Sequence, residues 1–255
     1  MPCTFPGGHG TNTVAPRRGE RNFDRMMKLR KFLAVLCGVL LSLGAAVAVL
    51  AFLVDGMGGS APLMHTLMER HAPAEKTGLP AEHYTAMTEM ITDYLSGREQ
   101  IFQFGFTDAQ GVARQCFRDH EQRHMADVKA LFDLCRMVML VSVAALVALG
   151  FGAYVLRDRR ALVARGFLWG CLGVLAALTA LAVWGAVDFE GLFVLFHHLS
   201  FTNDLWLLDP RTDLLIRLMP TNFFVHYAAL LGGTWLGALL LMAATALHLS
   251  KRWKA

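Results

Sequence analysis

The chain has 255 residues, of which 55% are hydrophobic and only 17% are charged. Ordinary soluble domains carry about 25% charged residues, so the composition argues against a soluble protein. The net charge is +4, and the basic residues form no stripe that would favour nucleic acid as a partner. We therefore expect an integral membrane protein that does not bind nucleic acid.

The N-terminal part of the chain precedes the first apolar run. Residues 1–31 are basic and begin with a stretch rich in Gly, Pro, Thr and Arg, which predicts disorder. The next run, 32–54, is long enough to cross a bilayer, which takes about 20 residues. A cleaved signal peptide is an alternative, but its apolar part is typically about 7–15 residues long. We expect the helix to be retained.

Three further apolar runs lie at 136–156, 166–187 and 223–249. Each is long enough to span the bilayer. A backbone in lipid must satisfy its own hydrogen bonds, so each run should be a helix. The sequence predicts an α-helical integral membrane protein with four transmembrane helices.

The distribution of Lys and Arg predicts the orientation. Of the 24 basic residues, 14 lie before the first run, in the loop 157–165 or in the tail 250–255. The positive-inside rule makes this side cytoplasmic, together with both chain ends. The segments 55–135 and 188–222 would then be extracellular; we call them the first and second outer segments.

The first outer segment should form a mainly helical cap lying on the membrane. Residues 80–97 have apolar side chains at helical spacing. Residues 102–106 alternate apolar and polar, which predicts a small strand or an interfacial turn, and 107–111 resembles a turn. A second helix is expected to begin near Ala113 and to continue into the second membrane helix.

The second outer segment is dense in aromatic residues mixed with His, Asn and Asp. Aromatic residues commonly anchor membrane proteins at the headgroup level, but the number of polar groups suggests a further role. Asp209 and Asp213 could cap a short helix at 212–219, and this interpretation stands beside a catalytic one.

A short motif raises the possibility of a metal site. His120-Glu121-x-x-His124 matches the pattern in which two histidines one helical turn apart bind zinc and the glutamate acts as a base. The third ligand would have to come from elsewhere in the chain. A membrane zinc metalloprotease is thus one alternative function, and a solvated polar helix face is the other interpretation of the motif.

Other classes of chemistry lack their signatures. The sequence has no nucleophile elbow, P-loop or dinucleotide fingerprint. Histidines, carboxylates and aromatic residues near the outer membrane face suit general acid–base catalysis on a lipid-embedded substrate. Transport is disfavoured because the four runs lack charged groups near the midplane. A non-enzymatic membrane assembly or binding protein is the second alternative.

Two longer motifs resemble those of a known family. The first is E-x-x-H-M-x-D-V-K at 121–129, and the second is F-H-x-x-x-F-x-N-x-x-W-x-L-D-P at 196–210. The sequence DYLSG at 93–97 also fits. Together they resemble the bacterial four-helix membrane family that includes the lipoprotein intramolecular transacylase, from about Phe32 to the C-terminus.

The resemblance implies an enzyme that acts on lipoproteins whose N-terminal cysteine carries a diacylglyceryl group. It would move the sn-2 acyl chain onto the substrate's own amine and give a lyso-form lipoprotein. By motif, the two catalytic histidines are His124 and His197. The expected supporting residues are Glu121, Asp127, Asn203, Trp206, Asp209 and Asp213. The expected substrate-binding residues are Tyr94, Phe196, Phe201, Phe223 and Phe224.

Elementary chemistry agrees with this reaction. The substrate supplies its own nucleophile, and histidine, with a pKa near 6.5, can move protons in both directions at neutral pH. The reaction passes through a ring of about eight members, which an aromatic pocket can help to close. We expect His124 to be the main base, oriented or charged by Asp127 or Glu121. His197 would polarise the carbonyl or protonate the leaving oxygen, although the sequence leaves these roles interchangeable.

The remaining expectations concern bystander residues, cofactors, oligomeric state and location. His120 and His198 lie outside the family pattern and are expected to be bystanders. We expect no cofactor and no metal ion, and a monomer surrounded by bilayer lipids. The enzyme would be a multi-pass protein of the bacterial cytoplasmic membrane with its active site on the extracytoplasmic face. The sequence leaves open the lipoprotein clients, the preferred acyl chain and the start codon, because Met26 or Met27 could begin the protein.

Overall fold

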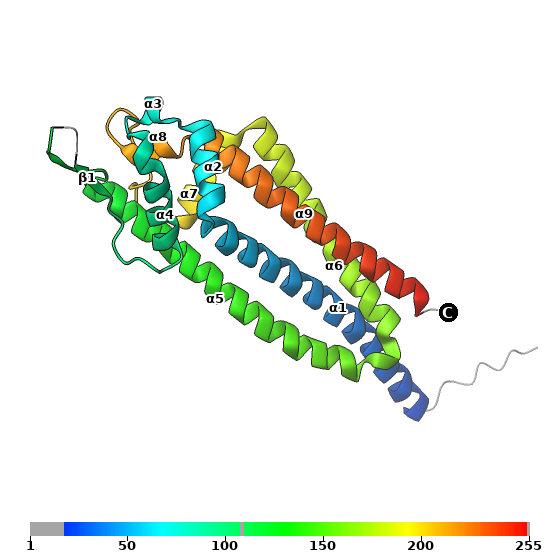
Figure 1. Ribbon diagram of the computed structural model, residues 1–255. Helices are drawn as coiled ribbons and strands as arrows, with labels where there is room; N and C mark the ends of the chain where they lie inside the picture. Colours follow the sequence, from blue (N-terminus) through cyan, green and yellow to red (C-terminus); the bar gives the residue numbers. More distant parts are fainter. Residues whose placement is uncertain (1–17, 108–109, 254–255) are drawn as a thin grey trace, which may run out of the picture.

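The structure is a computed structural model that describes residues 18–107 and 110–253 of the chain. Long helices run side by side over most of the length, and shorter elements gather at one end (Figure 1). The disorder expected for residues 1–17 lies outside the described residues.

Four helices of the described chain are long and apolar enough to cross a membrane. They are α1 (Arg18–Gly58), α5 (Asp119–Val155), α6 (Arg160–Val187) and α9 (Thr221–Arg252). Each contains one of the four apolar runs found in the sequence. The predicted fold class, an α-helical membrane protein with four spanning helices, is confirmed.

Helix α1 begins well before its apolar run. The sequence predicts disorder for residues 18–31, but these residues are the first turns of α1. They include Arg, Lys, Met and Leu, which are good helix formers, and Glu20 in the first turn. Extending an existing helix adds one hydrogen bond for each residue fixed and avoids the cost of nucleation. This part of the prediction is therefore wrong.

Glycines set the close approach of α1 and α6. A Cβ atom added at Gly166 would lie 2.1 Å from the carbonyl oxygen of Val35, and one added at Gly38 would lie 2.0 Å from a backbone oxygen of α6. Small residues allow this approach in lipid, where helices gain little from hydrophobic burial against each other. Helix α1 also packs along α5, and Trp235 of α9 donates a hydrogen bond to the Ala46 carbonyl at 3.0 Å. The central position of α1 organises the other three helices.

We call the end of the molecule that carries the shorter elements the cap. Its elements are α2 (Ala61–His71), α3 (Ala74–Thr77), η1 (Ala81–His83), α4 (Tyr84–Leu95), β1 (Gly105–Thr107), β2 (Ala113–Gln115), α7 (Phe189–Ser200), α8 (Leu214–Leu218) and the first turns of α5 and α9. At the opposite end, η2 (Arg157–Arg159) joins α5 to α6.

The cap has a hydrophobic core of its own. Its largest fully buried side chains are Phe223, Met68, Met87, Ile91 and Leu218. They come from α2 and α4 in the first outer segment and from α8 and α9 in the second half of the chain. Burial of one such side chain contributes roughly 1.5–3 kcal/mol. The two outer segments therefore fold as one unit that fixes the cap ends of α5 and α9.

A small hairpin precedes α5. Strand β1 pairs antiparallel with β2, with Phe106 opposite Arg114. Residues 113–115 are thus a strand, and the prediction of a helix beginning near Ala113 is wrong. Helix α5 begins at Asp119, where the Glu121 carboxylate in the first turn accepts a hydrogen bond from the backbone N–H of the preceding residue, Arg118, at 2.8 Å.

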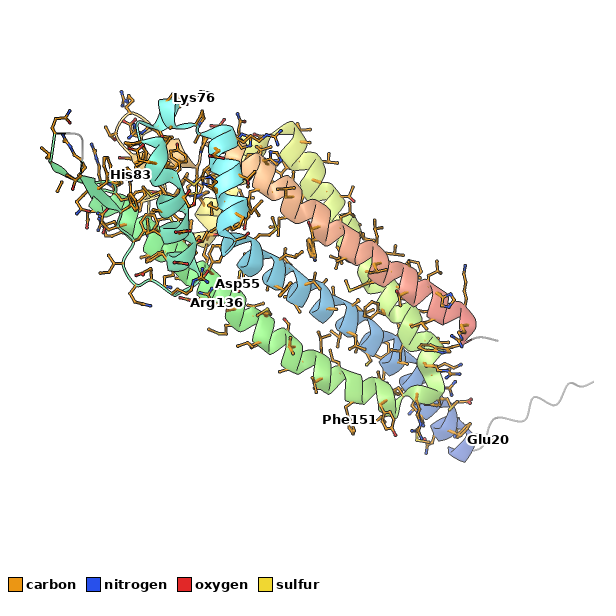
Figure 2. All side chains as sticks on the ribbon, viewed as in Figure 1. Glu20, Asp55, Lys76, His83, Arg136 and Phe151 are labelled. Carbon is orange, nitrogen blue, oxygen red and sulfur yellow. The ribbon has the colours of Figure 1, made fainter. Side chains whose placement is uncertain are left out.

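A charged cluster lies where α5 passes from the cap into its apolar part. Asp55 and Arg136 lie close together (Figure 2), and the Arg136 guanidinium donates to the Asp55 carboxylate at 2.6 Å. It donates to the Asp133 carboxylate as well. It also donates to the Leu95 carbonyl at the end of α4 at 3.2 Å. One side chain thus joins α1, α4 and α5, and the residues of α5 that precede Arg136 belong to the cap.

The glycine contact between α1 and α6 predicts unequal effects of two alanine substitutions on one helix. Gly166→Ala should lower the free energy of unfolding by about 1–3 kcal/mol, because the new methyl group meets backbone that cannot move aside. Gly173→Ala is the matched control, since a Cβ at Gly173 meets no atom within 4 Å and alanine favours the helix. Thermal unfolding in detergent measures both, and equal midpoints for the two variants would contradict the packing argument.

Candidate active site

The two histidines predicted from the motifs lie face to face in the cap. His124 is in the second turn of α5, and His197 is near the C-terminal end of α7. Their ring centroids are 6.2 Å apart, and the ring planes are inclined by 29°. Each residue is only 7% exposed. Two imidazoles distant in sequence thus form one buried site.

Aromatic side chains surround the pair. The ring centroid of His197 lies 4.1 Å from that of Phe193 and 4.9 Å from that of Trp206. Phe201 contacts His124 at 5.3 Å, and Phe196 contacts His197 at the same distance. Phe201, Phe196 and Trp206 were expected here. Phe193 was missed, although its position one turn before His197 on the same helix face is a signal in the sequence.

The tautomer of His197 is fixed by its own helix. Its Nδ1 atom lies 2.7 Å from the Phe193 carbonyl oxygen. A carbonyl only accepts, so Nδ1 carries the proton, and Nε2 of the neutral ring holds a lone pair. Burial lowers the pKa of His197, and the nearby His198 adds to this effect, whereas the Phe193 carbonyl opposes it. At neutral pH the ring is therefore an uncharged base.

His124 is also neutral at physiological pH. Burial, and to a lesser extent the neighbouring His197, lowers its pKa to about 4, against the opposing effect of Asp127. Among the described residues, the buried Nδ1 atom of His124 has no hydrogen-bond partner. A buried polar atom without a partner is costly, so this nitrogen is available to a bound molecule.

The loop after α7 is tied to α5 beside the histidines. The amide of Asn203 donates to the Asp127 carboxylate at 2.9 Å, and its oxygen accepts from the backbone N–H of Leu205 at 3.1 Å. Asp127 lies three residues after His124 on α5. These two expected supporting residues therefore hold the loop that carries Trp206.

Glu121 is buried completely and uses both carboxylate oxygens on backbone groups. One accepts from the Arg118 N–H and the other from the Leu215 N–H, each at 2.8 Å. The residue therefore joins the N-termini of α5 and α8. No hydrogen bond between Glu121 and His124 is found among the described residues, so orienting His124 directly is not its role in this structure.

Asp213 pairs with His120, which was expected to be a bystander. The Asp213 carboxylate lies 3.0 Å from His120 Nε2 and accepts from the Asp209 N–H at 2.8 Å. Burial would raise its pKa, but the hydrogen bonds from His120, Asp209 and Thr212 hold the pKa below the usual value. Asp213 occupies the N-cap position of α8, as the helix-cap interpretation expected, but its side chain makes no capping hydrogen bond to this helix. Its contacts with His120 and Asp209 instead connect α5 to the loop between α7 and α8.

Asp209 is placed at the edge of the same loop. Its carboxylate accepts hydrogen bonds from two nitrogens of the Arg211 guanidinium, Nη2 at 2.7 Å and Nε at 3.0 Å, and one from the Arg211 backbone N–H. These bonds lower its pKa to about 2. Asp209 and Asp213 thus shape the loop, and their described partners do not include His124 or His197.

The remaining expected substrate-binding residues divide into two groups. Phe224 lies one ring away from the pair, 5.2 Å from Phe193. Phe223 and Tyr94 are buried in the core of the cap, at 2% and 5% exposure. The ring of Tyr94 packs on Phe102. Phe223 and Tyr94 therefore support the site through packing.

The geometry does not favour the zinc motif. His120 is directed to Asp213, His124 faces His197, and both oxygens of Glu121 are used by backbone groups. In the part of the chain that the structure describes, no group of three or more His, Cys, Asp or Glu side chains is placed to hold a metal ion. The three residues of the motif therefore have separate partners and do not converge on one point.

Comparison with known proteins finds one matching family model and several similar solved structures. The family model described as lipoprotein intramolecular transacylase Lit matches residues 39–224. The structure of the membrane integral lipoprotein intramolecular transacylase Lit from Bacillus cereus is similar, with a TM-score of 0.69 and 22% identity over 88% of this chain and 98% of that chain.

Two further structures of the Bacillus cereus protein carry a histidine replaced by arginine or by alanine. Both have a TM-score of 0.68 and 20% identity, and they cover 92% and 91% of this chain and 98% and 99% of theirs. No match to a curated protein sequence was found. These structural likenesses show the fold, and the family model, which covers 39–224 of 255 residues, shows that the chain belongs to the lipoprotein intramolecular transacylase family of acyltransferases.

Proposed function

We propose that this chain transfers the sn-2 acyl chain of a diacylglyceryl-cysteine lipoprotein to the substrate's own N-terminal amine, with His124 and His197 as the proton-transfer groups. The observation that carries the catalytic assignment is the pair of buried neutral imidazoles, with ring centroids 6.2 Å apart, inside an aromatic wall. A neutral imidazole can take a proton from an amine and return it to an alkoxide.

The proposed step conserves every atom and proton. The free amine attacks the ester carbonyl carbon and forms the C–N bond. One amine proton passes to a histidine, the bond between the carbonyl carbon and the sn-2 oxygen breaks, and the proton goes to that oxygen. The products are an amide and a free glycerol hydroxyl on the same molecule. The substrate is both donor and acceptor, so no serine or cysteine nucleophile is needed.

The tautomer of His197 narrows its role. With the Nδ1 proton held by the Phe193 carbonyl, neutral His197 has no proton on Nε2 to polarise a carbonyl. It can accept a proton there and then pass it on. His124 is the main base in the proposal, because its Nδ1 atom has no partner among the described residues. His197 is a second acceptor beside it.

Exposed apolar side chains on α7 and on the loop that carries Trp206 support access from the membrane. Phe196 is 52% exposed, Leu199 79% and Leu207 62%. Such side chains would lie in lipid, which lets acyl chains reach the site without crossing water. Both histidines come from one chain, so a monomer surrounded by bilayer lipids is sufficient.

The basic residues at the other end of the molecule support an assignment of the membrane face. Positive charge favours the cytoplasmic side, so we propose that the cap and the site face the extracytoplasmic side of the bacterial cytoplasmic membrane. The diacylglyceryl group of a lipoprotein anchored in the outer leaflet would then meet the site at the level of its glycerol.

The catalytic assignment predicts that His124→Ala and His197→Ala each lower formation of lyso-form lipoprotein by about 10²-fold or more, because a proton-transfer group is lost. The measurement is mass analysis of a lipoprotein N-terminus from a host that lacks N-acylating enzymes. His248→Ala, on the exposed side of α9 at the end away from the cap, is the matched control and should keep full activity. Full activity in both site variants would refute the assignment.

The proposed orientation predicts which engineered cysteines can be reached from outside the cell. In a background without the native cysteines, Glu99→Cys in the cap should react with a membrane-impermeant maleimide in intact cells. Arg157→Cys, exposed at the opposite end, should react only after the cells are opened. Labelling in the reverse order would place the site on the cytoplasmic face and contradict the proposal.

The lowered pKa of His124 predicts how folding stability depends on pH. The unfolded residue titrates near 6.5 and the folded one at about 4, so the unfolded state binds more protons between these values. The free energy of unfolding should therefore fall as the pH drops from 6.5 towards 4, by on the order of 2 kcal/mol from this residue. His124→Gln should flatten the dependence measured by thermal unfolding, whereas His248→Gln should not. The same shift keeps the base neutral, and activity intact with respect to His124, at pH 6.

A further inference from the structure

Trp206 has a polar atom that the described contacts leave unused. The residue lies in the loop after α7, with its indole 4.9 Å from the His197 ring and 5.2 Å from the His198 ring. Its Nε1 atom is buried and has no hydrogen-bond partner among the described residues. An indole N–H is a donor only, so it can be satisfied only by an acceptor.

In another tryptophan of the chain, the indole N–H has a hydrogen-bond partner, as is usual for a buried donor. Trp235 donates its Nε1–H to the carbonyl of Ala46 at 3.0 Å, in a region with no proposed chemistry. A buried donor without an acceptor destabilises the fold. The unpartnered donor of Trp206 therefore marks a place where a bound molecule supplies the acceptor, and the partnerless Nδ1 of His124 lies in the same aromatic enclosure.

The proposed reaction needs a donor that the histidine pair does not supply. Attack on the ester places negative charge on the carbonyl oxygen, and preorganised donors at this point are a large part of catalysis in acyl transfer. His197 spends its Nδ1–H on the Phe193 carbonyl and has a lone pair on Nε2. The carbonyl oxygen of the substrate therefore needs another donor beside His197.

We infer that the Nε1–H of Trp206 is the donor to the ester carbonyl oxygen and to the oxyanion that forms from it. This inference rests on the proposed function. When the amine nitrogen bonds to the carbonyl carbon, the π electrons of the carbonyl move to its oxygen, which accepts the hydrogen bond from Trp206. When the bond to the sn-2 oxygen breaks, the carbonyl re-forms as an amide. Trp206 exchanges no proton at any step.

The loop holds the indole ready for this role. Asn203, three residues before Trp206, donates to Asp127 of α5 at 2.9 Å. Beyond Trp206, the backbone N–H of Asp209 donates to the buried Asp213 carboxylate at 2.8 Å. Both anchors fix the loop before substrate arrives, and a donor that needs no reorganisation stabilises the transition state best.

Trp206→Phe removes the N–H and keeps an aromatic ring in the wall. We expect kcat to fall by about 10²–10³-fold, with KM changed by less than about threefold, because the bond is strongest to the oxyanion. Trp169→Phe is the neutral control, since this indole is 67% exposed on α6. Trp235→Phe controls for the loss of an indole N–H whose partner lies within the chain. Both controls should keep the kcat of the unchanged protein.

A second variant and a second readout separate chemistry from packing. Replacement of Trp206 by 3-benzothienylalanine puts sulfur in place of the N–H in a ring of the same shape, and it should reproduce the loss of kcat. A phosphonate analogue of the diacylglyceryl-cysteine headgroup, tetrahedral and anionic, should bind both variants about 10-fold or more weakly than it binds the unchanged protein. Binding of the ester substrate should change little.

The outcomes distinguish this inference from the proposed function. If the histidine variants lose activity while either Trp206 variant keeps full kcat, the oxyanion role is overturned and the histidine assignment stands. A rise in KM without a fall in kcat would show that Trp206 contributes only to substrate binding, and it would equally overturn the inference. If the benzothienyl variant keeps full kcat while Trp206→Phe is unstable, the Trp206 ring is needed for packing and its N–H takes no part in the reaction. This result would also overturn the inference. Full activity in the histidine variants would instead defeat the proposed function.

Discussion

The buried carboxylate of Glu121 is the interaction on which the site depends. It accepts hydrogen bonds from the first turns of two helices, at Arg118 and at Leu215, which are far apart in the sequence. A carboxylate that receives two backbone N–H groups is well satisfied, and it adds favourable charge at both helix N-termini. Because α5 carries His124 and α8 ends the loop that carries Trp206, this one side chain fixes the spacing between the base and its surroundings.

Burial and sequence-local hydrogen bonding then decide the state of the histidines. The aromatic wall removes water from both rings and keeps them neutral, while Asp127, tied to Asn203, lies close enough to moderate the effect on His124. The Phe193 carbonyl selects the tautomer of His197. The protonation state of the two histidines therefore depends mainly on their burial. Nearby groups on the same helix or the adjoining loop select the tautomer and moderate the pKa.

Much of the fold could be predicted from the sequence, because the thickness of a bilayer requires each spanning helix to contain about 20 mostly apolar residues. The two histidines were identified from motif resemblance, and the structure brings them together. What the sequence did not show depends on contacts between distant residues. The pairing of His120 with Asp213, the hairpin at 113–115 and the dual role of Glu121 arise from tertiary packing. Phe193 acts partly through its backbone carbonyl, which every residue has, so the sequence shows only the part played by its ring.

The enclosure of His124 and His197, each 7% exposed, has a consequence for the traffic of water and protons. The proposed reaction is an isomerisation: the substrate and the product contain the same atoms and the same number of exchangeable protons. A histidine that takes a proton from nitrogen returns it to oxygen within one turnover, so the enzyme is restored without exchange with the medium. Such a site needs no channel for water, and a dry site protects the ester from hydrolysis, which would release the acyl chain as a free fatty acid.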